Sequence, residues 1–276
     1  MYQFWFVFPF TFKILFMFLF FTCLLAYANP SPEVSQIISQ YNKVGSFSLP
    51  VLSESQERLL HKGNVVTIIN NDNDNSGRLV GYMLTSASLE QLWIGTQDPH
   101  FQVQSRAKDL LLKDLGKGDM IWYAYADMPF PFADRHWVNL VTEEEFLLPN
   151  TNDRVWEHSW KLMPDGLKMA LPMIEKGALQ GVKIDMTQKA IYLPKNNGSW
   201  IGIEMGEQNL YVYYVALDFG GAIPEDIMLK YIKSGLPKML LDINKRALGA
   251  GKHYQLNHEH VIFGGDKKPI KQKNLQ

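Results

Sequence analysis

The sequence predicts an α+β fold in which a curved, mostly antiparallel β-sheet is packed against a long C-terminal helix. Short β-rich segments separated by turn residues recur from residue 64 to residue 217, as in an antiparallel sheet. After them, Pro224 stands at the start of a long segment whose apolar residues recur every three or four positions as far as Leu248. An apolar sheet face and an apolar helix stripe are most simply buried against each other.

The first 28 residues have the features of an export signal. Lys13 precedes an unbroken apolar run from Ile14 to Leu25, and Ala26-Tyr27-Ala28 is the small-x-small pattern that signal peptidases recognise. We therefore expect a mature chain that begins at Asn29 and is periplasmic or secreted. An uncleaved membrane anchor is the alternative, because the residues before Lys13 are also mostly apolar.

The composition excludes some classes of enzyme and argues against some classes of partner. Cys23 is the only cysteine and lies in the predicted signal, so the mature chain can form no internal disulfide and cannot be a thiol enzyme. Lys13 is one of 27 basic residues, which leaves 26 of them against 28 acidic residues. This slightly acidic balance argues against nucleic acid as a partner.

We expect one globular domain with short additions at its ends. The predicted regions are a signal peptide over 1–28, a helical segment over 29–62, the sheet domain over 63–250 and a polar tail over 251–276. Apolar spacing predicts helices over 31–43 and 54–61. Ser88 can cap a further helix that ends before Pro99. Neither period fits residues 165–187, which stay unassigned.

The β-rich segments predict the strands of the sheet. They cover residues 64–70, 78–85, 107–115, 120–126, 135–142, 155–162, 191–193, 200–205 and 211–217. The first two form a hairpin around the turn 72–77. That turn has oxygen-bearing side chains at alternate positions, like the start of a calcium loop, but Met83 stands where the last ligand of such a loop is an acid. A polar turn is therefore predicted.

Four segments are notable for their order along the chain. They are Leu60–Val66, Leu92-Trp93 with Asp98–Phe101, Met128–Val138 with its Pro-Phe-Pro-Phe-Ala-Asp-Arg run, and Asp218–Pro224. In this order they resemble the START-related lipid-binding family of the START/SRPBCC superfamily, in its bacterial exported members, over about residues 59–248. The resemblance implies a helix-grip fold, in which the sheet wraps the C-terminal helix and encloses an apolar cavity.

The resemblance also implies binding or transfer of a hydrophobic molecule, for which we favour a lipid loaded by transient contact with a membrane. A sterol is not favoured over a phospholipid or a fatty acyl chain. Asp134 and Arg135 are candidates to anchor a carboxylate or phosphate head group, and the alternative is a structural role at the Pro129–Pro131 turn.

Alternating aromatic residues and the helix stripe supply candidate cavity-lining residues, although such patterns are also typical of plain sheet core. The candidates are Tyr123, Tyr125 and Tyr213 on strands, and Leu229, Ile232, Leu236 and Leu240 on the C-terminal helix. Pro237 is expected to bend that helix and is a candidate hinge for ligand exchange.

The alternative to a carrier is an enzyme on the same scaffold, a cyclase, aromatase or hydrolase acting on a hydrophobic substrate. Glu204, His158 and Asp134 could then act as acids or bases. The sequence contains no Gly-x-Ser-x-Gly elbow, and His258 and His260 lack an evident third metal ligand. We therefore predict no catalytic residue, no metal and no cofactor. A partner-binding module with a collapsed cavity is a third hypothesis.

Overall fold

The computed structural model describes residues 34–71, 77–98, 107–221, 225–254 and 261–271, and the side chains of 225–234 are not among the parts described. The chain from Val34 onward forms one compact unit. The predicted export signal, the hairpin turn 72–76 and the His258-Glu259-His260 segment lie outside the described residues.

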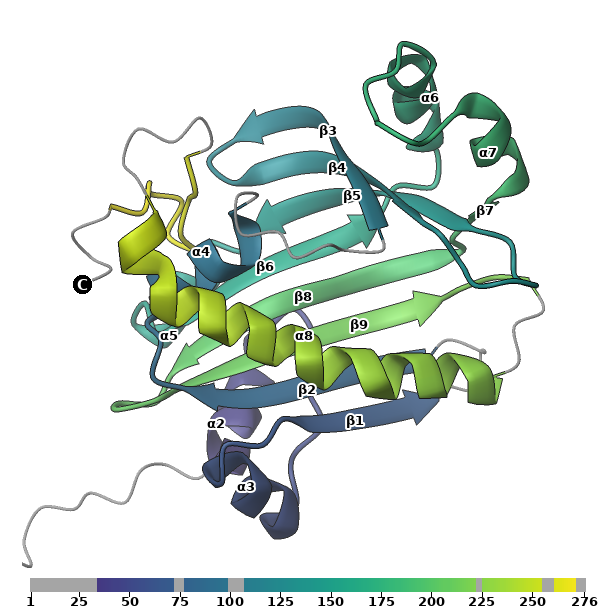
Figure 1. Cartoon of the computed structure of the whole chain (residues 1–276). Coiled ribbons are helices and arrows are strands. Elements are labelled where there is room, and N and C mark those ends of the chain that lie inside the picture. The colour runs from purple at the N-terminus through teal and green to yellow at the C-terminus, as the bar shows by residue number, and fades with distance from the viewer. Residues whose placement is uncertain (1–33, 72–76, 99–106, 222–224, 255–260, 272–276) are drawn as a thin grey trace, which may run out of the picture. The chain divides into compact units, whose positions relative to one another are not determined.

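One sheet contains the nine strands of the described residues (Figure 1). They are β1 (Val66–Asn71), β2 (Gly77–Thr85), β3 (Ala107–Gly116), β4 (Asp119–Ala126), β5 (Arg135–Glu143), β6 (Val155–Leu162), β7 (Ile191–Tyr192), β8 (Lys195–Glu204) and β9 (Asn209–Asp218). Their order is β1-β2-β9-β8-β6-β5-β4-β3, with β7 parallel to β5 and every other pair antiparallel. The mostly antiparallel sheet that the β-rich segments predicted is confirmed.

The described residues contain seven helices, four of them where capping and apolar spacing predict one. They are α2 (Val34–Tyr41), α3 (Glu54–His61), α4 (Leu89–Gln97), α5 (Leu147–Thr151), α6 (Leu167–Glu175), α7 (Ile184–Lys189) and α8 (Glu225–His253). Ser88 caps α4 as predicted, and its hydroxyl accepts a hydrogen bond from the Gln91 backbone. Two helices, α6 and α7, lie in or overlap the stretch 165–187 that had no assignment. The sequence did not indicate them, because each is too short to display a clear period and α6 contains Pro172.

The two faces of the sheet are buried by different partners. Along β9, Leu210, Val212 and Tyr214 belong to a core with α2 and α3, whereas Tyr211 and Val215 belong to a core with α4 and α8. This alternation follows from the two-residue period of a strand. We call the face toward α8 the inner face and the opposite face the outer face; Figure 1 shows α8 and the pair α2–α3 on opposite sides of β2.

The C-terminal helix packs on the inner face through the predicted stripe. Leu236, Leu240 and Ile243 are at most 4% exposed. Near its end α8 crosses α4 backbone to backbone, because a Cβ added at Gly95 would lie 2.9 Å from both the Ala247 nitrogen and the Ile243 carbonyl oxygen. Only glycine permits this approach, which sets how closely α8 can lie to the sheet.

The C-terminal residues differ from the predicted polar tail. Ile262 and Ile270 are each 5% exposed and belong to the same core as α8. Phe263 and Pro269 pair in an isolated β-bridge, and Lys267 forms an ion pair of 2.9 Å with Asp119. Residues 261–271 therefore pack against the inner-face core; the charged residues around the two isoleucines made this segment look solvated in the sequence.

A buried carboxyl group joins α2 to the outer face. Glu157 of β6 is fully buried and accepts a hydrogen bond of 2.8 Å from the hydroxyl of Tyr41 in α2. Burial is the largest influence and raises the pKa of Glu157, while hydrogen bonds from Tyr41 and Ser46 lower it. The charged form is therefore disfavoured by the fold.

The Gly95→Ala change is expected to lower the free energy of unfolding by about 1–3 kcal/mol, because the new methyl group meets backbone atoms of α8 that cannot move aside. Helix propensity alone predicts the opposite, a gain of about 1 kcal/mol. The matched control is Gly249→Ala in α8, where the nearest contact is at 3.6 Å and no loss is expected. Urea denaturation measures both, and equal stabilities would contradict the close α4–α8 crossing.

The Glu157→Gln change is expected to stabilise the protein increasingly as pH rises above the ordinary carboxyl pKa of 4.5. The sign follows from linkage: the native state holds the proton more tightly than the unfolded state, so the contribution of Glu157 is lost as pH rises through its folded pKa. Urea midpoints of variant and wild type, compared from pH 4 to pH 8, test this. The control Glu145→Gln alters an exposed residue, where a change within about 0.5 kcal/mol is expected.

Candidate ligand-binding site

Aromatic rings gather on the inner face at the centre of the sheet. Trp200 of β8 lies opposite Tyr213 of β9, and their ring centroids are 4.5 Å apart. Trp200 also stacks on Tyr211 at 5.6 Å, and Trp160 of β6 lies 5.8 Å from Tyr213. Three neighbouring strands thus present a continuous apolar surface.

Glycine in β8 makes room for the Trp160 ring. A Cβ at Gly198 would lie 2.3 Å from the Trp160 ring, so the indole rests directly on the strand. Its Nε1 donates a hydrogen bond of 3.1 Å to Asn196 Oδ1. The ring is therefore held by both packing and a hydrogen bond.

The inner face is less completely filled than the outer face at the same strands. Trp200 and Tyr213 are only half-buried, although β8 and β9 lie in the middle of the sheet. Their outer-face neighbours Ile201 and Val212 are 0% exposed. Large aromatic side chains in central strands are normally covered, so their residual exposure marks a surface that a ligand could cover.

The helix closes this surface at the β1–β2 side. A Cβ at Gly81 of β2 would lie 2.8 Å from methyl groups of both Leu236 and Leu240. These two predicted lining residues therefore contact the sheet directly. Leu229 and Ile232 belong to the α8 backbone, but their side chains lie outside the described part of the structure.

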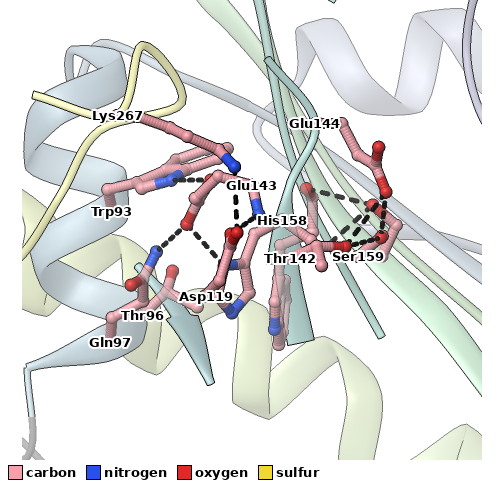
Figure 2. A network of polar contacts seen from close by, with 12 residues as sticks. Trp93, Thr96, Gln97, Asp119, Thr142, Glu143, Glu144, His158, Ser159 and Lys267 are labelled. Atoms are coloured by element: carbon pink, nitrogen blue, oxygen red, sulfur yellow. Dashed lines mark hydrogen bonds and ion pairs between the residues drawn. The ribbon is translucent and has the colours of Figure 1, made fainter. Parts of the chain in front are cut away.

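A polar network lies at the α4 end of the inner face. Figure 2 shows the Glu143 carboxylate accepting hydrogen bonds from Trp93 Nε1 at 3.1 Å, Gln97 Nε2 at 3.2 Å and His158 Nδ1 at 2.5 Å. Glu143 is 2% exposed and His158 is 8% exposed. The other ring nitrogen of His158 is turned away from Glu143 (Figure 2). The network ties α4 to β5 and β6 and leaves one imidazole nitrogen outside it.

A second polar group lies at the other side of the inner face, on β3, β4 and β5. Trp122 lies opposite Asn139, and its indole hydrogen-bonds to the half-buried Asp109. Burial raises the pKa of Asp109 to about 6, and the hydrogen bond from Trp122 opposes this shift. Asn139 is 7% exposed, and its Oδ1 has no hydrogen-bond partner among the described residues. Sequence analysis missed these three residues, since strand alternation does not tell which face is inner.

Arg135 donates hydrogen bonds to the backbone segment that leads toward α8. Its side chain is buried, and Nε donates to the Phe219 carbonyl at 2.6 Å while Nη2 donates to the Gly220 carbonyl at 2.8 Å. Nη1 donates to the Ala133 carbonyl. Burial lowers the pKa of Arg135, and Asp134 partly offsets this effect. The guanidinium is thus engaged by carbonyl groups of the protein itself.

Asp134 has the structural role that was the alternative to head-group binding. Its carboxylate accepts hydrogen bonds from the Tyr125 hydroxyl at 2.6 Å and from the Met128 backbone at 2.8 Å. It thereby closes the turn that contains the cis Phe130–Pro131 peptide bond. The structure does not bring Asp134 and Arg135 together as a pair facing the inner-face aromatic surface.

Tyr123 and Tyr125 lie on the outer face and not with Tyr213. They pack in a core with α6 and α7, and both rings contact His136 edge-on, with centroids 6.0 and 6.3 Å away. Burial lowers the pKa of His136 to about 4, so this imidazole is neutral near pH 7. Of the three predicted tyrosines, only Tyr213 faces α8, because period two fixes alternation but does not say which set faces the helix.

The described residues contain no cluster of His, Cys, Asp or Glu suited to a metal ion. Within those same residues, no helix is both long and apolar enough to cross a membrane.

The Arg135→Met change is expected to lower the free energy of unfolding of the ligand-free protein by about 2–4 kcal/mol, because buried carbonyl groups lose their donors. The control is Arg154→Met, an exposed position where a change within about 0.5 kcal/mol is expected. Thermal or urea unfolding measures both. Unchanged stability combined with loss of binding to anionic lipids would restore the head-group hypothesis.

Comparison with known proteins gives likeness of fold. No family model and no curated protein matches the sequence. Human STARD10 is 12% identical, with 76% of this chain and 86% of that chain covered and a TM-score of 0.49. Human StAR-related lipid transfer protein 5 is 10% identical, with 77% and 94% covered and a TM-score of 0.48. A STAR-related lipid transfer protein from Xanthomonas axonopodis is 15% identical, with 67% and 93% covered and a TM-score of 0.49.

At these identities the likeness concerns the fold alone. The architecture itself is an antiparallel sheet that holds a long C-terminal helix on its inner face, with the predicted strand and helix order. The chain therefore has the helix-grip fold that the sequence predicted.

Proposed function

We propose that this protein is exported and binds or transfers a hydrophobic molecule, a lipid, between the inner face of the sheet and α8. The supporting observation is the incomplete burial of Trp200 and Tyr213 in the centre of the sheet. Water beside such rings is unfavourable, and an apolar ligand that replaces it gains free energy without any charged contact.

Burial alone can hold such a ligand. Each methylene group moved from water into an apolar site contributes about 0.8 kcal/mol, so an acyl chain of moderate length can offset the loss of its freedom. The flat faces of Trp160 and Trp200 suit a chain or a ring equally. Because the guanidinium of Arg135 already donates to backbone carbonyl groups, it is not expected to bind a charged head group of the ligand.

Location outside the cytoplasm follows from the export signal predicted at residues 1–28. Membrane lipids of the envelope would then be the available cargo, and loading would require transient membrane contact. If the signal remains as an anchor, the domain would exchange lipid only with nearby membranes. The first residue of the mature protein, expected at Asn29, distinguishes the two.

A second candidate is an enzyme acting on a hydrophobic substrate, and the Glu143–His158 pair favours it. A carboxylate that holds one imidazole nitrogen while the other stays outside the pair is the arrangement of a general base. The same contacts also have a structural use, since Glu143 is fixed by Trp93 and Gln97 of α4. A carrier returns its ligand unchanged, whereas an enzyme releases a product of different mass.

The protein purified gently from its own host is expected to carry a hydrophobic molecule, detected by native mass spectrometry. After delipidation it should take up a fluorescent fatty acid or alcohol. The Tyr213→Arg change should weaken this uptake at least about tenfold, because it places a charge on the inner face.

The matched control is Leu140→Arg, which alters a half-buried outer-face position of β5. Its uptake should stay near that of the wild type once circular dichroism has shown that both variants fold. The absence of any co-purifying molecule together with no uptake by the delipidated protein would rule out the carrier proposal. Equal loss in both folded variants would remove the inner face as the site.

A further inference from the structure

Asn139 is a buried polar side chain with an unmet hydrogen bond. It lies on the inner face of β5, on the same side as Val141, and is 7% exposed. Its Oδ1 has no partner among the described residues. A buried amide oxygen without a partner costs free energy comparable to a lost hydrogen bond, so a native fold that keeps one has a use for it.

The neighbours of Asn139 form a small polar area in an otherwise apolar surface. Trp122 lies directly opposite it on β4, and side chains so placed have Cβ atoms about 4.5–5.5 Å apart. The indole of Trp122 is occupied by Asp109 on β3. The Asn139 amide oxygen therefore lies beside the half-buried ring of Trp122, and the Asp109 carboxyl group lies one strand farther, on β3.

The charges at this area disfavour an anion. Asp109 itself becomes negative near neutral pH, and a carboxylate or phosphate beside it would be repelled. Arg135, on the same face of β5, donates to the carbonyl groups of Phe219 and Gly220. A neutral group that can donate a hydrogen bond fits these partners best.

From this geometry we propose that the bound hydrophobic molecule ends in an uncharged hydroxyl group, which hydrogen-bonds to Asn139 at the β3–β5 side of the inner face. The inference rests on the proposed function and names the chemical class of its ligand. A hydroxyl group both donates and accepts, so it can satisfy the amide of Asn139 in either orientation. The apolar part of the molecule then extends toward Trp160, Trp200 and Tyr213.

Thr67 is a second residue on the inner face with an unmet hydrogen bond. It lies on β1 opposite Gly81, and its Oγ1 also lacks a partner within the described residues. Its place is at the far side of the sheet, next to the leucines of α8. A threonine hydroxyl can turn toward a neighbouring backbone group at little cost, whereas the buried amide of Asn139 cannot, so Asn139 is the favoured anchor.

The experiment compares 1-hexadecanol, hexadecyl methyl ether and hexadecanoic acid as competitors of a fluorescent lipid bound to the delipidated full chain. The wild type is expected to bind the alcohol about three- to tenfold more tightly than the ether, which cannot donate, and more tightly than the acid at pH 7.5. Asn139→Leu should abolish the preference for the alcohol while binding of the ether changes little. The matched control Thr67→Val should keep the preference.

Each outcome decides one claim. A preference lost in Thr67→Val and kept in Asn139→Leu would place the polar end at β1 and overturn the proposal. Equal binding of alcohol and ether by the wild type, or tighter binding of the acid, would also overturn it while leaving the carrier function intact. Failure of the wild type to bind any of the three probes or the fluorescent lipid would instead contradict the proposed function itself.

Discussion

The structure depends on a sheet whose central strands are apolar on both faces. On β9, Val212 and Tyr214 are buried by the N-terminal helices, so the outer face is complete without any ligand. On the inner face, α4 and α8 pack against the sheet, while Trp200 and Tyr213 stay half-buried. The strand period assigns every second residue to each face. The helices that bury the outer face therefore leave the apolar side chains of the inner face to be covered by other elements.

Close packing at two glycines fixes how α8 lies on α4 and on the sheet. At Gly95 the backbones of α4 and α8 meet, and at Gly81 two leucines of α8 rest on β2. Arg135 adds a further constraint at the opposite end of α8, where it binds the carbonyl groups that precede the helix. Movement of α8 for ligand exchange would therefore break contacts at both ends of the helix. The free-energy cost of this movement depends on the packing at Gly95 and on the hydrogen bonds of Arg135.

Two polar sites on the inner face differ in how far their hydrogen bonds are satisfied. At one of them, the Glu143–His158 network is largely satisfied by α4. At the other, Asn139 lacks a partner. In the proposed complex, burial of the apolar part of the ligand supplies the affinity, and the hydrogen bond to Asn139 supplies the orientation.

The sequence by itself determined the order and type of the main elements, because these depend on local chemistry: the Ser88 cap, the spacing of Leu236 and Leu240, and turn residues between strands. It could say that Tyr123 and Tyr213 alternate with their neighbours. Only the tertiary structure decided that Tyr123 faces outward and Tyr213 inward, and that Arg135 is engaged by backbone carbonyls. The reason is that a sheet face is inner or outer according to the helices that pack on it, and those helices are distant in the chain.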